Sequence, residues 1–119
     1  MMKLLPGLAL LIGAAAVLGA RPSLPAHAQQ VAVSELKAQT HIHGLAVDRQ
    51  DPSYLLMATH HGLFRTGPDG KAERISVVQD FMGFNPHPND PDILYASGHP
   101  ADGGNLGFIA STDRGRTWE

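Results

Sequence analysis

The chain has 119 residues, enough for one small domain, and a formal net charge of −2. Its 9 lysines and arginines form no basic stripe against 11 acidic residues, which argues against nucleic acid as a partner. It has no cysteine, which excludes disulfides, thiolate metal sites and lipid attachment through cysteine.

The first 28 residues have the features of a secretory signal peptide in the expected order. Lys3 precedes an apolar run from Leu4 to Ala20, and a polar stretch then ends in a small-x-small site at Ala28. This order predicts export to the periplasm or the cell exterior, with cleavage after Ala28. An uncleaved membrane anchor is the alternative. After cleavage, residues 29–119 would carry a formal charge of −4 and no segment long enough to cross a membrane.

The rest of the sequence is a repeat. The stretch HGLAVDRQDPSYLLMATH (His43–His60) aligns without a gap on MGFNPHPNDPDILYASGH (Met82–His99), at an offset of 39. After six extra residues in the second copy, Gly62–Glu73 aligns on Gly107–Trp118 at an offset of 45. A period of about 40 residues is typical of a propeller blade or a helical repeat.

Short apolar runs bounded by Asp, Pro, Gly or Asn favour strands over helices. Four short strands per repeat predict an all-β fold, a β-propeller with two four-stranded blades in an incomplete ring. A strand or linker at 29–39, with a strand at Val31–Lys37, would precede blade 1 at 40–79 and blade 2 at 80–119. The strands expected in the two blades are Ile42–Val47, Tyr54–Thr59, Leu63–Thr66 and Arg74–Val78, then Phe81–Phe84, Ile93–Ser97, Phe108–Ser111 and one beginning at Thr117.

Two blades would leave both outer faces bare, because each blade of a propeller packs on a neighbour at either side. We therefore expect this sequence to be a fragment of a longer propeller, with its last strand interrupted after Glu119.

The run STDRGRTW, near the end of the chain, has the composition of a hairpin turn. Asp113 can accept hydrogen bonds from backbone N–H groups that follow it, and Gly115 suits a position with positive φ. Ser111 and Thr117 flank the turn with hydroxyl groups, and Trp118 offers a ring to bury beside it. These roles set backbone geometry and need no substrate.

These eight residues resemble the Asp-box, or BNR repeat, at every defining position. The chain from Thr40 to Glu119 resembles the N-terminal part of an Asp-box β-propeller and is most similar to bacterial exported glycosyl hydrolase or exo-α-sialidase-like proteins. The superfamily also includes sortilin-type receptors and photosystem assembly factors. The resemblance implies a structural box between the third and fourth strands of a blade. The first repeat keeps Thr66 and Gly70 but has Pro68 and Glu73 in place of the box aspartate and tryptophan.

No catalytic residue is predicted. Sialidase-type hydrolysis would need three arginines, a tyrosine–glutamate pair and an acidic residue, and no residue here can be matched to these positions. A retaining glycosidase needs two carboxylates about 5 Å apart. The leading expectation is a non-catalytic binding or scaffold module for an unknown small molecule, glycan or protein. The alternative is a glycoside hydrolase whose catalytic residues lie in further blades.

The histidines give a second alternative, a periplasmic metal-binding protein. His41 and His43 share one face of a predicted strand, about 6.5–7 Å apart, and His60 and His99 occupy the same position in the two repeats. The hypothesis is that these four line the channel or its mouth and bind a small ligand or a transition metal such as Cu or Zn. The alternative is four polar strand-end residues bonded to loops. His87 is expected to be a turn residue.

Overall fold

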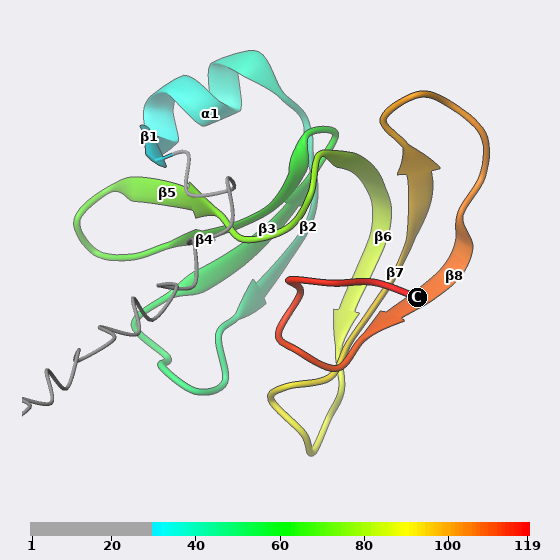
Figure 1. Cartoon of the computed structure of the whole chain (residues 1–119). Helices are drawn as coiled ribbons and strands as arrows, with labels where there is room; N and C mark the ends of the chain where they lie inside the picture. The colour runs from blue at the N-terminus through cyan, green and yellow to red at the C-terminus, as the bar shows by residue number, and fades with distance from the viewer. Residues whose placement is uncertain (1–29) are drawn as a thin grey trace, which may run out of the picture.

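The computed structural model describes residues 30–119, and the predicted signal segment at 1–28 lies outside these residues. Two antiparallel sheets and one short helix, α1 (Val33–Gln39), make up the described part (Figure 1). The first sheet has the order β1-β5-β4-β3-β2 and the second has the order β6-β7-β8. The strands are β1 (Gln30–Ala32), β2 (Ile42–Val47), β3 (Leu55–Thr59), β4 (Gly62–Thr66), β5 (Lys71–Arg74), β6 (Gln79–Pro86), β7 (Leu94–Pro100) and β8 (Gly107–Ser111).

The predicted all-β class is confirmed by this architecture. Within residues 30–119 the two sheets stay separate and form no closed ring. In the same residues no helix has both the length and the apolar character needed to span a membrane.

The strand register is the same in both sheets. Pairs in the first sheet recur in the second at the offsets of 39 and 45 residues found in the sequence: Leu45↔Met57 and Met57↔Phe64 become Phe84↔Ala96 and Ala96↔Ile109. The first strand of each sheet also carries an irregularity at the same place, between Ile42 and Gly44 and between Phe81 and Gly83. The sequence repeat is therefore also a structural repeat.

The strand expected at Val31–Lys37 is wrong beyond Ala32, because Val33–Gln39 forms helix α1. The sequence VAVSELK permits both readings, since Val33 and Leu36 lie three residues apart on one face of a helix. Leu36 is only 4% exposed and belongs to a small core with Met57 and two further residues of the first sheet. Burial of Leu36 against the sheet favours the helix here.

The fourth strand of the first repeat lies earlier than expected, at Lys71–Arg74 instead of Arg74–Val78. Gly70 has a φ of +72°, so the chain reverses tightly and pairs with β4 at once. The chain leaves the sheet at Ile75, whose side chain packs against the core between the sheets. In the second repeat Glu119 exchanges two backbone hydrogen bonds with Ala110, of 2.8 and 3.0 Å, beside β8 where a fourth strand was expected to begin.

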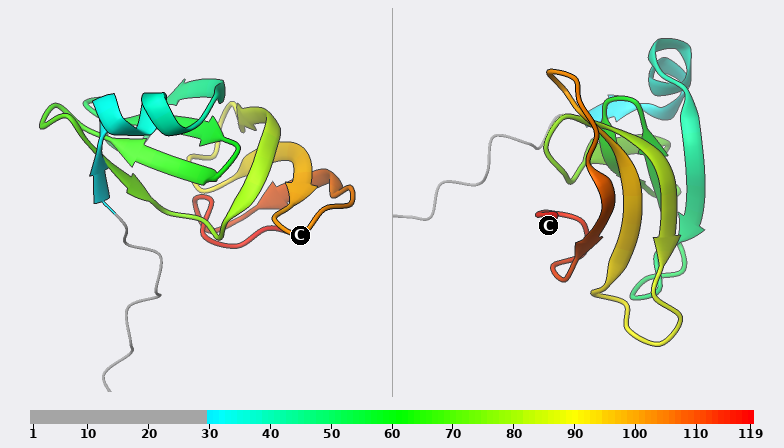
Figure 2. Two further views of the ribbon diagram at one scale, coloured as in Figure 1. Left: turned by 90° about the horizontal axis from the view of Figure 1, so that it is seen from above. Right: turned by 90° about the vertical axis from the view of Figure 1, so that its right-hand side faces the viewer.

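The main core lies between the two sheets, which Figure 2 shows side by side. Its buried members are Leu56, Ala58 and Leu63 from the first sheet and Phe81, Leu94, Ala96 and Ile109 from the second. Along this core β2 packs against β6, a line of contact that we call the seam. Gly44 allows the close approach, because a Cβ atom there would lie 3.0 Å from the Cβ of Phe84.

Candidate metal centre

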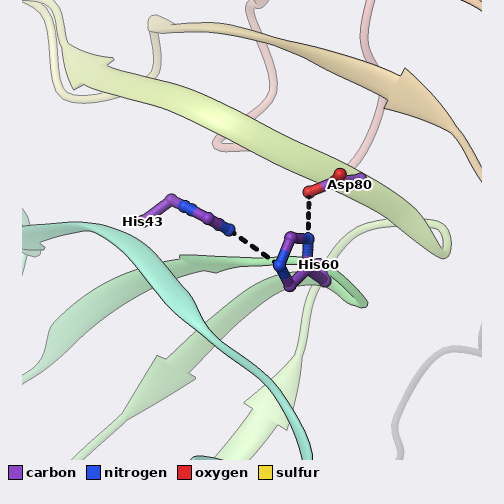
Figure 3. Close-up of side chains that lie close together, drawn as sticks. All are labelled: His43, His60 and Asp80. Carbon is purple, nitrogen blue, oxygen red and sulfur yellow. Dashed lines mark hydrogen bonds and ion pairs between the residues drawn. The ribbon is translucent and has the colours of Figure 1, made fainter.

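Two histidines and an aspartate meet at one end of the seam (Figure 3). The Nε2 atoms of His43 and His60 are 3.1 Å apart, and Nδ1 of His60 lies 2.8 Å from Oδ1 of Asp80. One candidate ligand atom from each residue lies within 4.8 Å of the other two. We call these three residues the His–Asp cluster. His43 and His60 belong to the first sheet and Asp80 to the second, so the cluster spans the seam.

Local backbone features place each member of the cluster. His43 stands at the irregularity in β2, where a bulge re-aims a side chain. His60 lies in the two-residue turn between β3 and β4. Thr59 closes this turn, because its hydroxyl accepts from the His61 N–H and donates to the Gly62 carbonyl. Gly62, the first residue of β4, has a φ of +123°, a conformation that glycine adopts readily.

The hydrogen-bond partners assign the protons of His60. A carboxylate only accepts hydrogen bonds, so Nδ1 of His60 donates to Asp80, and in the neutral imidazole Nε2 then presents a lone pair toward Nε2 of His43. An imidazole nitrogen lies about 2.0–2.1 Å from a bound zinc ion, and two nitrogens 3.1 Å apart then subtend about 95–100° at the ion. That angle suits one ion held by both rings. Asp80 stands where a carboxylate commonly orients a histidine that binds a metal ion.

His41 lies near the same two rings. Its ring centroid is 5.3 Å from that of His60 and 6.5 Å from that of His43. The side chain of His60 is 35% exposed and that of Asp80 is 23% exposed, so an ion can reach the cluster from solvent. Three of the four histidines in the predicted site therefore gather at one end of the seam.

His99 has a different partner. Its Nδ1 donates to the carbonyl oxygen of Gly104, 2.5 Å away, in the loop between β7 and β8. That loop holds the six extra residues of the second repeat, so His99 finds a backbone acceptor that its counterpart His60 lacks. The main chain of His99 still lies opposite Asp80 across β6 and β7. His87 is the turn residue that its sequence indicated, since its Nδ1 accepts from the N–H groups of Asn89 and Asp90.

Asp80 was not among the candidate residues, although the repeat holds a signal for it. At the offset of 39 residues Asp80 aligns with His41, so the same strand-end position carries a potential ligand in both copies. The alignment of the two copies does not show that Asp80, in the second copy, faces the turn between β3 and β4 of the first copy.

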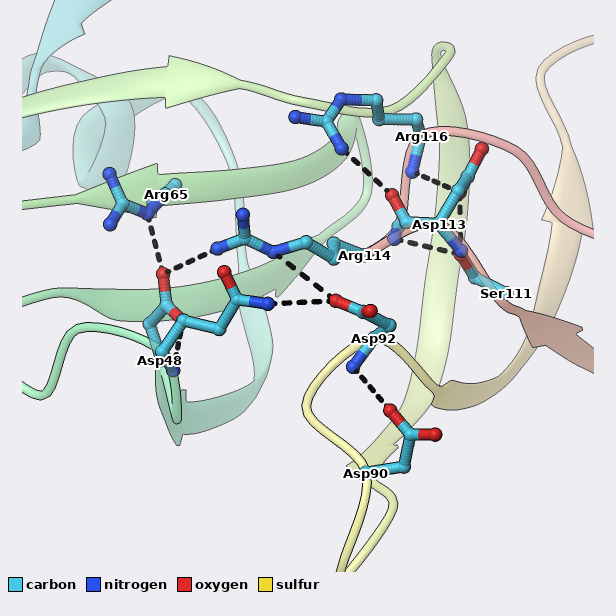
Figure 4. A network of polar contacts seen from close by, with 10 residues as sticks. Asp48, Arg65, Asp90, Asp92, Ser111, Asp113, Arg114 and Arg116 are labelled. Atoms are coloured by element: carbon cyan, nitrogen blue, oxygen red, sulfur yellow. Dashed lines mark hydrogen bonds and ion pairs between the residues drawn. The ribbon is translucent and has the colours of Figure 1, made fainter.

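The Ser111–Trp118 motif forms a compact turn, which we call the closing turn. Its polar groups bond to one another (Figure 4). Asp113 accepts from the N–H and hydroxyl of Thr117, at 2.8 and 2.6 Å, and from the hydroxyl of Ser111. Ser111 also accepts from the N–H of Gly115, and the indole of Trp118 donates to the Gly115 carbonyl. Burial raises the pKa of Asp113, but the hydrogen bonds from Thr117 and Ser111 outweigh it and hold that pKa below its ordinary value. These hydrogen bonds of the Asp113 carboxylate all lie within the turn.

A second polar network joins the sheets at the other end of the seam (Figure 4). Oδ2 of Asp48, which follows β2, lies 2.7 Å from Nε of Arg65 and 3.6 Å from Nη2 of Arg114 in the closing turn. Burial raises the pKa of Asp48, but the hydrogen bonds from Arg65 and the Gln50 N–H outweigh it, so the pKa is lowered. Gln50 also donates to Asp92, 2.8 Å away in the second repeat. This network is a structural counterpart to the His–Asp cluster.

No protein-family description, curated protein or solved structure matches this chain. The resemblance to Asp-box propellers therefore depends on the residues of the closing turn and on the repeat.

Proposed function

We propose that this chain is an exported, non-catalytic binding module of the Asp-box propeller type, and that its ligand is a divalent transition metal ion, copper or zinc. The observation that carries the proposal is the 3.1 Å separation of the Nε2 atoms of His43 and His60, with Asp80 on the other nitrogen of His60. Imidazole is a good ligand for both metals, and His41 stands close enough to supply a third ring. The signal segment predicted at residues 1–28 supports export.

Two aspartates of the described residues are poor candidates for the general acid of a glycoside hydrolase. A glycosidase needs a carboxylic acid that keeps its proton near neutral pH, which requires a raised pKa. Asp48 and Asp113 both have lowered pKa values, the first through arginine and backbone contacts and the second through the closing turn. Neither suits a general acid.

The test is a calorimetric titration of Zn²⁺ and of Cu²⁺ into the purified chain and three variants. We expect one ion per chain in the unsubstituted protein, and an affinity at least about tenfold lower in His43→Ala and His60→Ala. His61→Ala is the matched control, because His61 is the exposed neighbour of His60 and its assigned hydrogen bond uses the backbone N–H. Equal affinity in all four proteins would overturn the proposal, provided that circular dichroism shows the same fold in each.

A further inference from the structure

We propose that a metal ion in the His–Asp cluster locks the second sheet onto the first, so that metal occupancy sets how rigidly the two sheets are joined. This inference rests on the metal binding proposed above. Its structural basis is the origin of the three residues: His43 and His60 come from the first sheet, and Asp80 alone comes from the second. Whatever strengthens the contact between His60 and Asp80 therefore strengthens the seam.

The imidazole ring of His60 transmits the effect of the ion. A cation on Nε2 draws electron density from the ring, which makes the N–H at Nδ1 a stronger donor to the carboxylate of Asp80. The hydrogen bond across the seam, 2.8 Å long and already charge-assisted through the carboxylate, is then strengthened further. The ion also places positive charge within a few ångströms of the carboxylate.

The contact between His60 and Asp80 lies at the start of β6, where a neighbouring buried polar group lacks a hydrogen bond. Gln79, next to Asp80, has a buried side-chain nitrogen with no hydrogen-bond partner, so polar satisfaction is incomplete there. The chain reaches this point directly from the first sheet, through the short connection of residues 75–78. At the far end of the seam, roughly 16 Å away along β2, Asp48 and Arg114 already hold the sheets together.

The absence of cysteine permits a direct measurement of the seam. Spin labels are attached at Lys37→Cys, on α1 beside the first sheet, and at Asn85→Cys, on β6; both positions are exposed. Pulsed dipolar spectroscopy gives the distribution of distances between the labels, with and without saturating Zn²⁺, which is diamagnetic. We expect zinc to narrow this distribution in the labelled parent and in its His61→Ala control.

The decisive variant is Asp80→Ala in the same labelled background, because an asparagine would still accept a hydrogen bond from Nδ1 of His60. Its zinc affinity should fall about tenfold through the loss of an orienting carboxylate, so zinc is raised until calorimetry shows the site filled. The filled variant should keep the broad distribution of the zinc-free parent. A parent that binds zinc without narrowing, or a filled variant that narrows as much as the parent, would overturn the inference while the proposed function stands. No zinc binding in the parent would remove both.

Discussion

Gly115 occupies a position where backbone conformation and lack of space both exclude a side chain. Its φ is +88°, and a Cβ atom there would lie 2.5 Å from Cδ2 of Leu63 and 3.2 Å from Cδ1 of Leu94. The closing turn thus inserts its glycine between side chains of both sheets. Gly70 is the counterpart in the first repeat, with a φ of +72° and no atom within 4 Å of the corresponding Cβ position.

Alanine substitutions at Gly70 and Gly115 separate the conformational cost of a side chain from its packing cost. Gly70→Ala should lower the free energy of unfolding by about 1–2 kcal/mol, the cost of a left-handed conformation. Gly115→Ala carries the same cost and also overpacks the core, for a total of about 2–5 kcal/mol. Urea unfolding of both variants gives the comparison. Equal losses would show that the closing turn is free to move away from Leu63.

Asp113 makes the stability of the closing turn dependent on pH. Its pKa in the folded chain is below the ordinary 3.8, so its contribution is fully present above that value and is lost as pH falls through the folded pKa. Asp113→Asn should therefore lower the free energy of unfolding at neutral pH by about 1–2 kcal/mol. The gap between the two proteins should shrink below pH 3.8 in urea titrations. A constant gap down to pH 2 would mean that the charge of Asp113 contributes nothing.

At the scale of elements, α1 covers part of the outer face of the first sheet with buried Leu36 and half-buried Val33. Leu36 is 4% exposed, while its neighbour Lys37 is exposed. Leu36→Ala should lower the free energy of unfolding by about 2–3 kcal/mol, the low part of the range for buried leucines, because a short helix at the edge can shift to fill space. Lys37→Ala should leave it nearly unchanged. Similar small losses in both, measured by urea unfolding, would place α1 off the sheet.

Four strands could be predicted closely, whereas α1 and β5 could not, for a physical reason; β6 and β7 were predicted too short. β2, β3, β4 and β8 lie within one residue of the expected bounds, because turn residues close each apolar run. Val33–Gln39 has no such local punctuation, and the contact of Leu36 with Met57 selects helix over strand. β5 depends likewise on its pairing with β4, which begins directly after Gly70.

At the scale of the whole molecule, the two polar networks lie at opposite ends of one seam. The His–Asp cluster holds the start of β2, and the contacts of Asp48 with Arg65 and Arg114 hold its end. The apolar core between them joins the same two sheets. The grouping of His41, His43 and His60 could be anticipated from strand alternation and the repeat, whereas the part played by Asp80 depends on how one repeat packs on the next.

The two hairpins differ in loop length, and the repeated histidines in them have different partners. His60 stands in a two-residue turn and faces Asp80, whereas His99 is followed by a longer loop and bonds to Gly104. The same residue type at the same position of the repeat therefore makes different contacts in the two sheets. Shortening the loop between β7 and β8 would remove the Gly104 acceptor and free the ring of His99 for another partner.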